Sequence, residues 1–173
     1  MEKWDLLDNK RRITGKYINR GDELPKGYYH QLIHVCIFNK EKKMLIQKRH
    51  PKKNKRPSLW DISCGGAVLA GEDTHTAASR ELFEELSIDH DFSKEKILMT
   101  LTYEQGFDDY FSLYLPSLDI KNLKLQKDEL TEVSFASLDE ILALIEKGEF
   151  VPYRKELISL IFVLRNSKSY IST

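Results

Sequence analysis

The residues with the clearest chemical meaning are three glutamates that follow a glycine-rich loop, in the stretch GGAVLAGEDTHTAASRELFEELSI at residues 65–88. Each residue of an α-helix advances about 100°, so Glu81, Glu84 and Glu85 would cover an arc of about 100° on one helix face. Carboxylates this close raise one another's pKa and destabilise the fold unless a cation offsets their charge. A divalent ion such as magnesium prefers oxygen ligands and would offset it. The spacing indicates a metal site, and a merely solvated acidic face is the alternative that these residues leave open.

The flanking residues favour the metal site over the solvated face. Glu72 and Arg80 are expected to form an ion pair that ties the loop to the helix. Because glycine lets the backbone approach closely, the carbonyl near Gly66 is expected to reach the metal.

The elements that must position these groups form a mixed α/β pattern. Helical character begins at Asp73 and Thr74, which are candidate caps, and Leu82, Phe83 and Leu86 project to a second side that would pack on a sheet. Residues 4–27 are expected to form a short hairpin and a loop. Further strands are expected at 31–39, 43–49, 60–64, 96–105, 108–116 and 129–137, and further helices at 137–148 and 152–166. This pattern predicts a compact α/β fold.

Composition limits the function classes. The chain has 173 residues with 27 basic and 27 acidic side chains, so no global field favours a nucleic acid polymer or a membrane. Its apolar runs are shorter than the roughly 20 residues that span a bilayer. Cys36 and Cys64 are too few for a disulfide framework. A cytoplasmic location is therefore expected.

The spacing of the glycine and the charged residues resembles the Nudix box, G-x5-E-x7-R-E-U-x-E-E-x-G-U with U apolar. The matching residues are Gly66, Glu72, Arg80, Glu81, Leu82, Glu84, Glu85 and Ile88. Ser87 departs from the pattern, since the family usually has glycine there. The chain is thus identified as a member of the Nudix superfamily. The resemblance implies an α/β/α sandwich around a mixed β-sheet. It also implies one domain over residues 1–173, with an N-terminal extension of about 1–28 and the box at 66–88.

The resemblance also implies roles for these residues. Nudix enzymes cleave nucleoside diphosphates linked to another moiety, X, with magnesium or manganese. Glu81, Glu84 and Glu85 correspond to the metal ligands, with the Gly66 carbonyl beside them, and Glu72 and Arg80 to an orienting pair. One of the three glutamates, or a loop carboxylate such as Glu129, would be the general base.

Outside the box, the first half of the chain resembles the isopentenyl-diphosphate isomerase branch of the superfamily. Arg49 and Lys53 match positions that clamp a diphosphate in that enzyme, and the loop HPKKNKRPS at 50–58 adds positive charge. The isomerase cysteine, however, falls on Gly65 rather than on Cys64. A metal-ligand histidine falls on Ala67, and the catalytic glutamate falls near Asp109.

These departures favour a hydrolase of a small diphosphate compound over an isomerase, and a non-catalytic binding module is the third interpretation. His30 and His34 are expected to be structural. The selectivity for X is expected to lie in the loops at 15–30, 50–58 and 103–110. Nudix domains often form dimers, so the resemblance makes a homodimer one candidate assembly and leaves the oligomeric state open.

Overall fold

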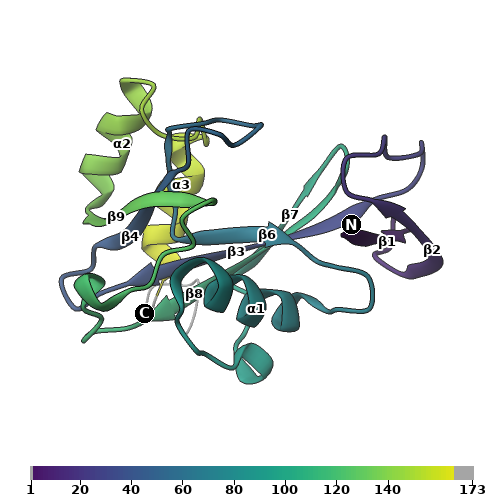
Figure 1. The fold of residues 1–173 in the computed structure, drawn as a ribbon, viewed down its shortest axis with the longest axis horizontal. Helices are drawn as coiled ribbons and strands as arrows, with labels where there is room; N and C mark the ends of the chain where they lie inside the picture. The colour runs from purple at the N-terminus through teal and green to yellow at the C-terminus, as the bar shows by residue number, and fades with distance from the viewer. Residues whose placement is uncertain (1, 166–173) are drawn as a thin grey trace.

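The computed structural model describes residues 2–165 and contains a seven-stranded sheet, a separate hairpin and three α-helices (Figure 1). The hairpin consists of β1 (Lys3–Leu7) and β2 (Ile13–Asn19). The sheet strands are β3 (His30–Phe38), β4 (Met44–Arg49), β5 (Trp60–Ile62), β6 (Cys64–Ala67), β7 (Met99–Tyr103), β8 (Gly106–Tyr114) and β9 (Leu130–Ala136). The helices are α1 (Thr74–Leu86), α2 (Leu138–Glu146) and α3 (Lys155–Leu164), with two 3-10 turns at Phe92–Lys94 and Ile120–Asn122.

The sheet divides into two wings, one built around β3 and the other around β4. β3 pairs in parallel with β8 along its whole length and antiparallel with β6, where Ile33 lies opposite Gly66. β4 pairs antiparallel with both β5 and β9. Strands 3 and 4 touch only near their turn, at Phe38 and Met44. Because β4 leaves β3 there, β6 takes its place beside the first half of β3.

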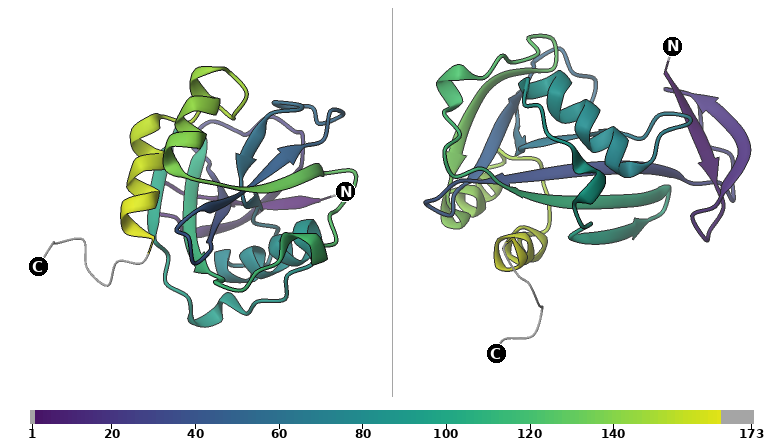
Figure 2. Two further views of the ribbon diagram at one scale, coloured as in Figure 1. Left: turned by 90° about the vertical axis from the view of Figure 1, so that its left-hand side faces the viewer. Right: turned by 90° about the horizontal axis from the view of Figure 1, so that it is seen from below.

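Successive side chains of β3 point to opposite faces of the sheet, and each face carries its own hydrophobic core. Ile33, Val35 and Ile37 belong to the core beneath α1, whereas Cys36 and Phe38 belong to the core beneath α2 and α3. Figure 2 shows α1 and α3 on opposite faces of the sheet. The predicted α/β sandwich around a mixed sheet is confirmed.

The single strand expected at 60–64 is wrong, because residues 60–67 form two strands that serve different wings. β5 pairs with β4 and β6 pairs with β3, with Ser63 between them. The Ser63 hydroxyl donates to the Leu45 carbonyl at 2.6 Å and accepts from the Ile37 amide at 2.8 Å. One buried hydroxyl thus joins both wings where the chain crosses between them.

The helix that carries the glutamates has the expected start and an unusual end. Asp73 is the N-cap and accepts from the Thr76 amide at 2.8 Å. Ser87 ends the helix with φ of 53°, the left-handed conformation that favours glycine. Its hydroxyl donates to the Lys124 carbonyl at 3.0 Å. Leu82 and Leu86 are fully buried as expected, but the expectation for Phe83 is wrong, since its side chain is 58% exposed.

The remaining two helices differ from expectation only at their ends. α2 begins with the predicted capping box at Ser137 and Glu140. α3 begins at Lys155, so Pro152 precedes the helix instead of lying in its first turn. Asn166, the expected end of this helix, lies outside the described residues.

The N-terminal hairpin lies at one end of the long strands, opposite the end that carries α2 (Figure 1). Leu7 and Tyr29 exchange two backbone hydrogen bonds, of 2.8 and 3.0 Å. The Trp4 ring stacks on His30 with 4.8 Å between centroids. Arg11, in the hairpin turn, forms an ion pair with the fully buried Asp109. These contacts join the hairpin to β3 and β8.

Among residues 2–165, every helix is too short or too polar to cross a bilayer. Cys36 and Cys64 are both free and buried.

Candidate active site

Arg80 is the centre of the polar network on α1. Its Nε and Nη2 donate to both carboxylate oxygens of Glu72, at 2.8 and 2.9 Å, and Nη2 also donates to the Ala67 carbonyl at 3.0 Å. Its Nη1 donates to Glu81 at 2.8 Å and to Glu84 at 3.2 Å. All five N–H groups of the guanidinium are therefore used. The structure confirms the ion pair between Glu72 and Arg80, which ties the loop before the helix to β6 and α1.

Glu81 lies directly against Gly66. A Cβ atom at Gly66 would lie 2.1 Å from the Glu81 Oε1, so only glycine lets the carboxylate approach this strand so closely. Burial raises the pKa of the Glu81 carboxyl, and the adjacent Arg80 only partly offsets that effect. The structure thus brings Glu81 and Gly66 together, as the spacing of the box predicts.

Glu85 is the most deeply buried of the three box glutamates. It is 7% exposed, and the Gln47 amide donates to its Oε2 at 3.1 Å. Burial, followed by the negative charge of Glu81, raises the pKa of this carboxyl to about 7, while contacts with Cys64 and Gln47 lower it. Sequence reasoning missed Gln47. The sequence feature that could have indicated it is a polar residue on the same face of β4 as the buried Leu45.

Glu84 lies at the rim of the network, where its side chain is 47% exposed. Within residues 2–165, no group of three or more histidine, cysteine, aspartate or glutamate side chains is gathered closely enough to hold a metal ion. Arg80 engages Glu81 and Glu84, whereas Glu85 points toward Gln47 and Cys64. Binding of one metal by all three carboxylates would therefore require these side chains to move closer together than they lie in this structure.

The donor chemistry nevertheless fits a hard divalent cation. All the side-chain donors are carboxylate oxygens, the ligands that magnesium and manganese prefer. The negative charge of the half-buried Glu81 raises the pKa of the buried Glu85, and a cation would relieve this repulsion. The Glu81 carboxylate fills the space above Gly66 that a Cβ would take, so a carboxylate donor lies directly against the strand backbone.

The basic loop 50–58 folds over the same region. Arg49, at the end of β4, forms an ion pair of 3.0 Å with Asp61 of β5. Lys53 forms an ion pair with Glu129, whose carbonyl also accepts from the His50 amide at 2.9 Å. Burial and then the charge of Arg49 lower the Lys53 pKa, whereas Glu85 and Glu81 raise it. Lys53 thus lies within electrostatic range of Arg49 and of the two box glutamates.

The histidines of β3 make structural contacts, as expected. His34 Nε2 lies 3.1 Å from Asp108, and its ring stacks on Tyr110 with 4.8 Å between centroids. Burial acts to lower the His34 pKa, but Asp108, Asp61 and Glu85 together raise it overall. His30 contacts the Tyr103 hydroxyl at 2.8 Å.

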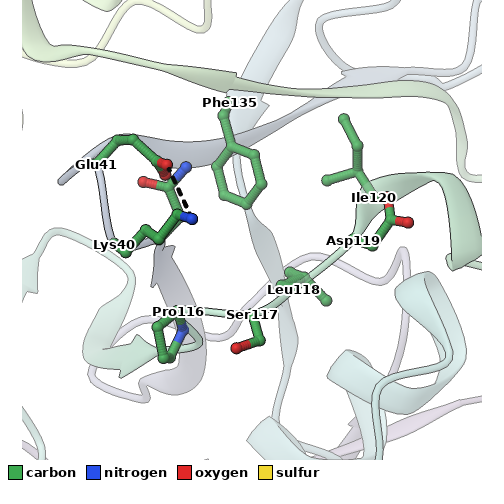
Figure 3. A pocket seen from close by; sticks show the side chains of 9 residues that line it. Lys40, Glu41, Pro116, Ser117, Leu118, Asp119, Ile120 and Phe135 are labelled. Carbon is green, nitrogen blue, oxygen red and sulfur yellow. Dashed lines mark ion pairs between the residues drawn. The ribbon is translucent and has the colours of Figure 1, made fainter.

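Two hollows in the described part of the surface have linings that do not include the box glutamates. The one shown in Figure 3 lies between the β3–β4 turn and the segment after β8, and its lining includes Asn39, Pro116 and Phe135. Ile33 is the strand partner of Gly66. Asn39 follows Ile33 by six residues, and six residues of a strand span about 20 Å. Lys40 in this hollow pairs with Glu41 at 3.8 Å. This surface therefore does not extend the charged site.

Comparison with known proteins now identifies the class. A family model for the NUDIX domain matches residues 29–160. An uncharacterised Nudix hydrolase of Listeria monocytogenes is 41% identical over 167 residues, which cover 96% of this chain and 97% of the relative. The chain belongs to the Nudix hydrolase family. The single domain over residues 1–173 stays a prediction, since Met1 and residues 166–173 lie outside the described structure.

Two further similarities concern the branch of the family and the fold. An isopentenyl-diphosphate Delta-isomerase of Pectobacterium atrosepticum is 29% identical over 146 residues, covering 79% of this chain and 76% of that protein. The predicted isomerase-like branch is therefore confirmed. A crystal structure of a protein from Deinococcus radiodurans has a TM-score of 0.76 at 24% identity, covering 91% of this chain and 98% of its own. That likeness shows the fold alone.

Proposed function

We propose that the protein is a magnesium- or manganese-dependent hydrolase that cleaves the diphosphate linkage of a small molecule, such as a nucleoside diphosphate derivative. The observation that carries this proposal is the burial of Glu85 beside Glu81 and Gly66, within electrostatic range of Lys53. Buried carboxylates that repel each other, with cations across from them, suit a site that binds metal and phosphate together. The free cysteines support a cytoplasmic location.

In this proposal the chain's own residues bind the substrate and move one proton. Glu81, Glu84, Glu85 and the Gly66 carbonyl would hold the metal, and Glu72 would orient Arg80. Arg49 and Lys53 would bind the diphosphate oxygens. When bound, the metal would neutralise phosphate charge and lower the pKa of an attacking water. One of the three box glutamates, or Glu129, would take the proton from that water as the bond between phosphorus and the bridging oxygen breaks.

An isomerase is the second candidate, because the chain is related to isopentenyl-diphosphate isomerases. Two observations argue against an isomerase. A Cβ at Gly65, where the isomerase cysteine would be, would lie 2.5 Å from His34 Nδ1, so the histidine ring fills that space. The Cys64 thiol belongs to the core beneath α1, and burial raises its pKa well above the ordinary value.

Asp109, near the position of the isomerase glutamate, is also engaged in structural contacts. It is fully buried and accepts from Arg11, Gln31 and Thr100. A carboxylate with these three donors has few lone pairs left to move a proton on a substrate. The structure therefore favours water attack on phosphorus over proton transfer on an alkene.

The test is a panel of nucleoside diphosphate derivatives, nucleoside triphosphates and isopentenyl diphosphate with magnesium, read by mass spectrometry so that cleavage and isomerisation are both visible. We expect cleavage by the wild type, and loss of at least about a hundredfold in Glu84→Gln and Glu85→Gln. Glu156→Gln, on exposed α3 surface, is the matched control and should keep full activity.

Each outcome decides between the candidates. Isomerisation without phosphate release would establish the isomerase. A wild type that binds these compounds but transforms none of them would establish a binding module. Full activity in both glutamine variants would refute the metal assignment.

A further inference from the structure

Asp61 lies where three elements meet beside the basic loop. It belongs to β5, is 7% exposed, and its carboxylate has partners on both oxygens. Oδ2 accepts from Arg49 Nη1 at 3.0 Å. Oδ1 accepts from the Tyr153 hydroxyl and from the Ile62 amide, both at 2.9 Å. The two fixed donors on Oδ1 leave the carboxylate little freedom to rotate.

The Arg49 guanidinium makes three contacts and has further N–H groups that these contacts do not use. Besides Asp61, its guanidinium donates from Nε to the Arg56 carbonyl at 3.2 Å and from Nη2 to the Lys55 carbonyl at 3.1 Å. A guanidinium has five N–H groups, so two of them are left for a ligand. These contacts fix the plane of the guanidinium, and that plane decides whether a diphosphate can be bound through two parallel hydrogen bonds.

Tyr153 reaches Asp61 from a segment that is itself anchored to β5. The Trp60 amide donates to the Glu149 carbonyl and the Val151 amide donates to the Trp60 carbonyl, both at 2.8 Å. The Tyr153 hydroxyl therefore approaches Asp61 from backbone that is hydrogen-bonded to the neighbouring residue. The segment before α3 is in this way joined through Asp61 to Arg49 at the end of β4.

We propose that Asp61 and Tyr153 are positioning residues that hold the Arg49 guanidinium in the orientation that binds the substrate diphosphate. This inference rests on the proposed function. A flexible arginine must lose rotamer freedom when it binds, whereas a guanidinium already held by three contacts has lost most of it beforehand. Asp61 removes part of the positive charge of Arg49 but fixes its geometry.

A purely electrostatic role for Asp61 predicts the opposite result. If its charge only repelled the diphosphate, removing that charge would tighten binding. If Asp61 positions Arg49, removing the charge loosens the guanidinium and weakens binding. Tyr153→Phe separates the effects further, because it removes one hydrogen bond from Asp61 without changing any charge.

The experiment measures binding of methylenediphosphonate, a diphosphate analogue that cannot be cleaved, by calorimetry with magnesium present. We expect Kd to rise about tenfold in Asp61→Asn and about threefold in Tyr153→Phe. In the Arg49→Lys background, Asp61→Asn should change Kd less than twofold, since its effect passes through the guanidinium. Asp89→Asn and Tyr114→Phe are the matched controls on exposed surface and should bind as the wild type does.

Circular dichroism identifies any variant that does not fold, and Tyr153→Phe keeps the test decisive if Asp61→Asn is such a variant. Unchanged or tighter binding in folded Asp61→Asn, or unchanged binding in Tyr153→Phe, overturns the positioning role alone. An equal loss in the wild-type and Arg49→Lys backgrounds also overturns it, because Asp61 would then act without the guanidinium. A wild type that binds no methylenediphosphonate overturns the proposed function, and the positioning role with it.

Discussion

Gly66 and Gly106 differ in what a methyl group would meet. At Gly66 it would lie 2.1 Å from Glu81 Oε1, at the far end of a flexible side chain, whereas at Gly106 it would lie 2.1 Å from the His30 backbone carbonyl in β3. We therefore expect Gly66→Ala to fold with a free energy of unfolding within about 1 kcal/mol of the wild type, but to lose hydrolysis as Glu81 is displaced. Gly106→Ala should lose more than about 2 kcal/mol, since the strand backbone cannot move aside.

Denaturant unfolding and the substrate panel, applied to both variants, check this contrast. A Gly66→Ala protein with full activity would contradict the role of close approach at the glutamate. A Gly106→Ala protein as stable as the wild type would show that the β3–β8 pairing adapts more easily than its geometry suggests.

Glu85 should reduce the stability of the metal-free protein at alkaline pH. Its pKa is raised from an ordinary 4.5 to about 7, so between these values the folded state binds a proton that the unfolded state has lost. Its contribution to stability is therefore lost as the pH rises through 7. Glu85→Gln removes this effect and should raise the free energy of unfolding by about 3 kcal/mol at pH 8 and by less than about 1 kcal/mol at pH 5.

Urea unfolding in EDTA at both pH values measures this difference, with Glu156→Gln as the control. A Glu85→Gln protein that is less stable than the wild type at pH 8 would mean that hydrogen bonds to the carboxylate outweigh its desolvation.

The sequence reveals residues whose spacing is fixed by a helix, but not those whose partners are distant in the chain. Glu72 and Arg80 are eight residues apart, and their ion pair follows from the loop and helix between them. Gln47 reaches Glu85 across 38 residues, and Asp61 reaches Tyr153 across 92. Such contacts depend on how the strands are ordered, which residue spacing does not encode.

At the scale of elements, hydrophobic alternation predicted most strands but not the division of the sheet. The stretch from Trp60 to Cys64 reads as one strand because its residues favour extended backbone throughout. It divides because the Ser63 hydroxyl bonds both Leu45 and Ile37, one from each wing. Phe83 reads as a core residue, yet it faces solvent because Leu82 and Leu86 already fill the contact with the sheet.

The N-terminal hairpin should depend on one ion pair for much of its docking. Arg11 pairs with Asp109, which is fully buried, so removing the arginine leaves a buried carboxylate without its cation. We expect Arg11→Ala to lower the free energy of unfolding by about 3 kcal/mol. The double variant Arg11→Ala with Asp109→Asn should recover part of this loss, because the uncompensated charge is gone.

Chemical denaturation of both variants checks the coupling, with Arg12→Ala as the control. Arg12 pairs with Asp8 on the surface of the same hairpin, and its side chain is 71% exposed, so its loss should cost less than about 1 kcal/mol. An equal loss in Arg11→Ala and Arg12→Ala would contradict the docking role of Asp109.

At the scale of the whole molecule, the charged site is assembled where the two wings separate. β6 supplies Gly66 from one wing, and β4 and β5 supply Arg49 and Asp61 from the other. α1 brings the glutamates against both wings, since Glu85 contacts Gln47 of β4 while Glu81 lies on Gly66 of β6. Binding of a ligand at this junction should therefore change the free energy of unfolding of the entire protein.

Magnesium should stabilise the folded protein through this junction. A ligand that binds only the folded state raises the free energy of unfolding, by about 2.7 kcal/mol at a concentration one hundred times its Kd. A metal must compete with the proton on Glu85, whose pKa is about 7, so the rise in Tm on adding magnesium should be larger at pH 8 than at pH 6. Glu85→Gln should lose most of this rise, whereas Glu156→Gln should keep it. Thermal unfolding in magnesium and in EDTA at both pH values measures the effect, and equal rises in the two variants would remove Glu85 from the proposed metal site.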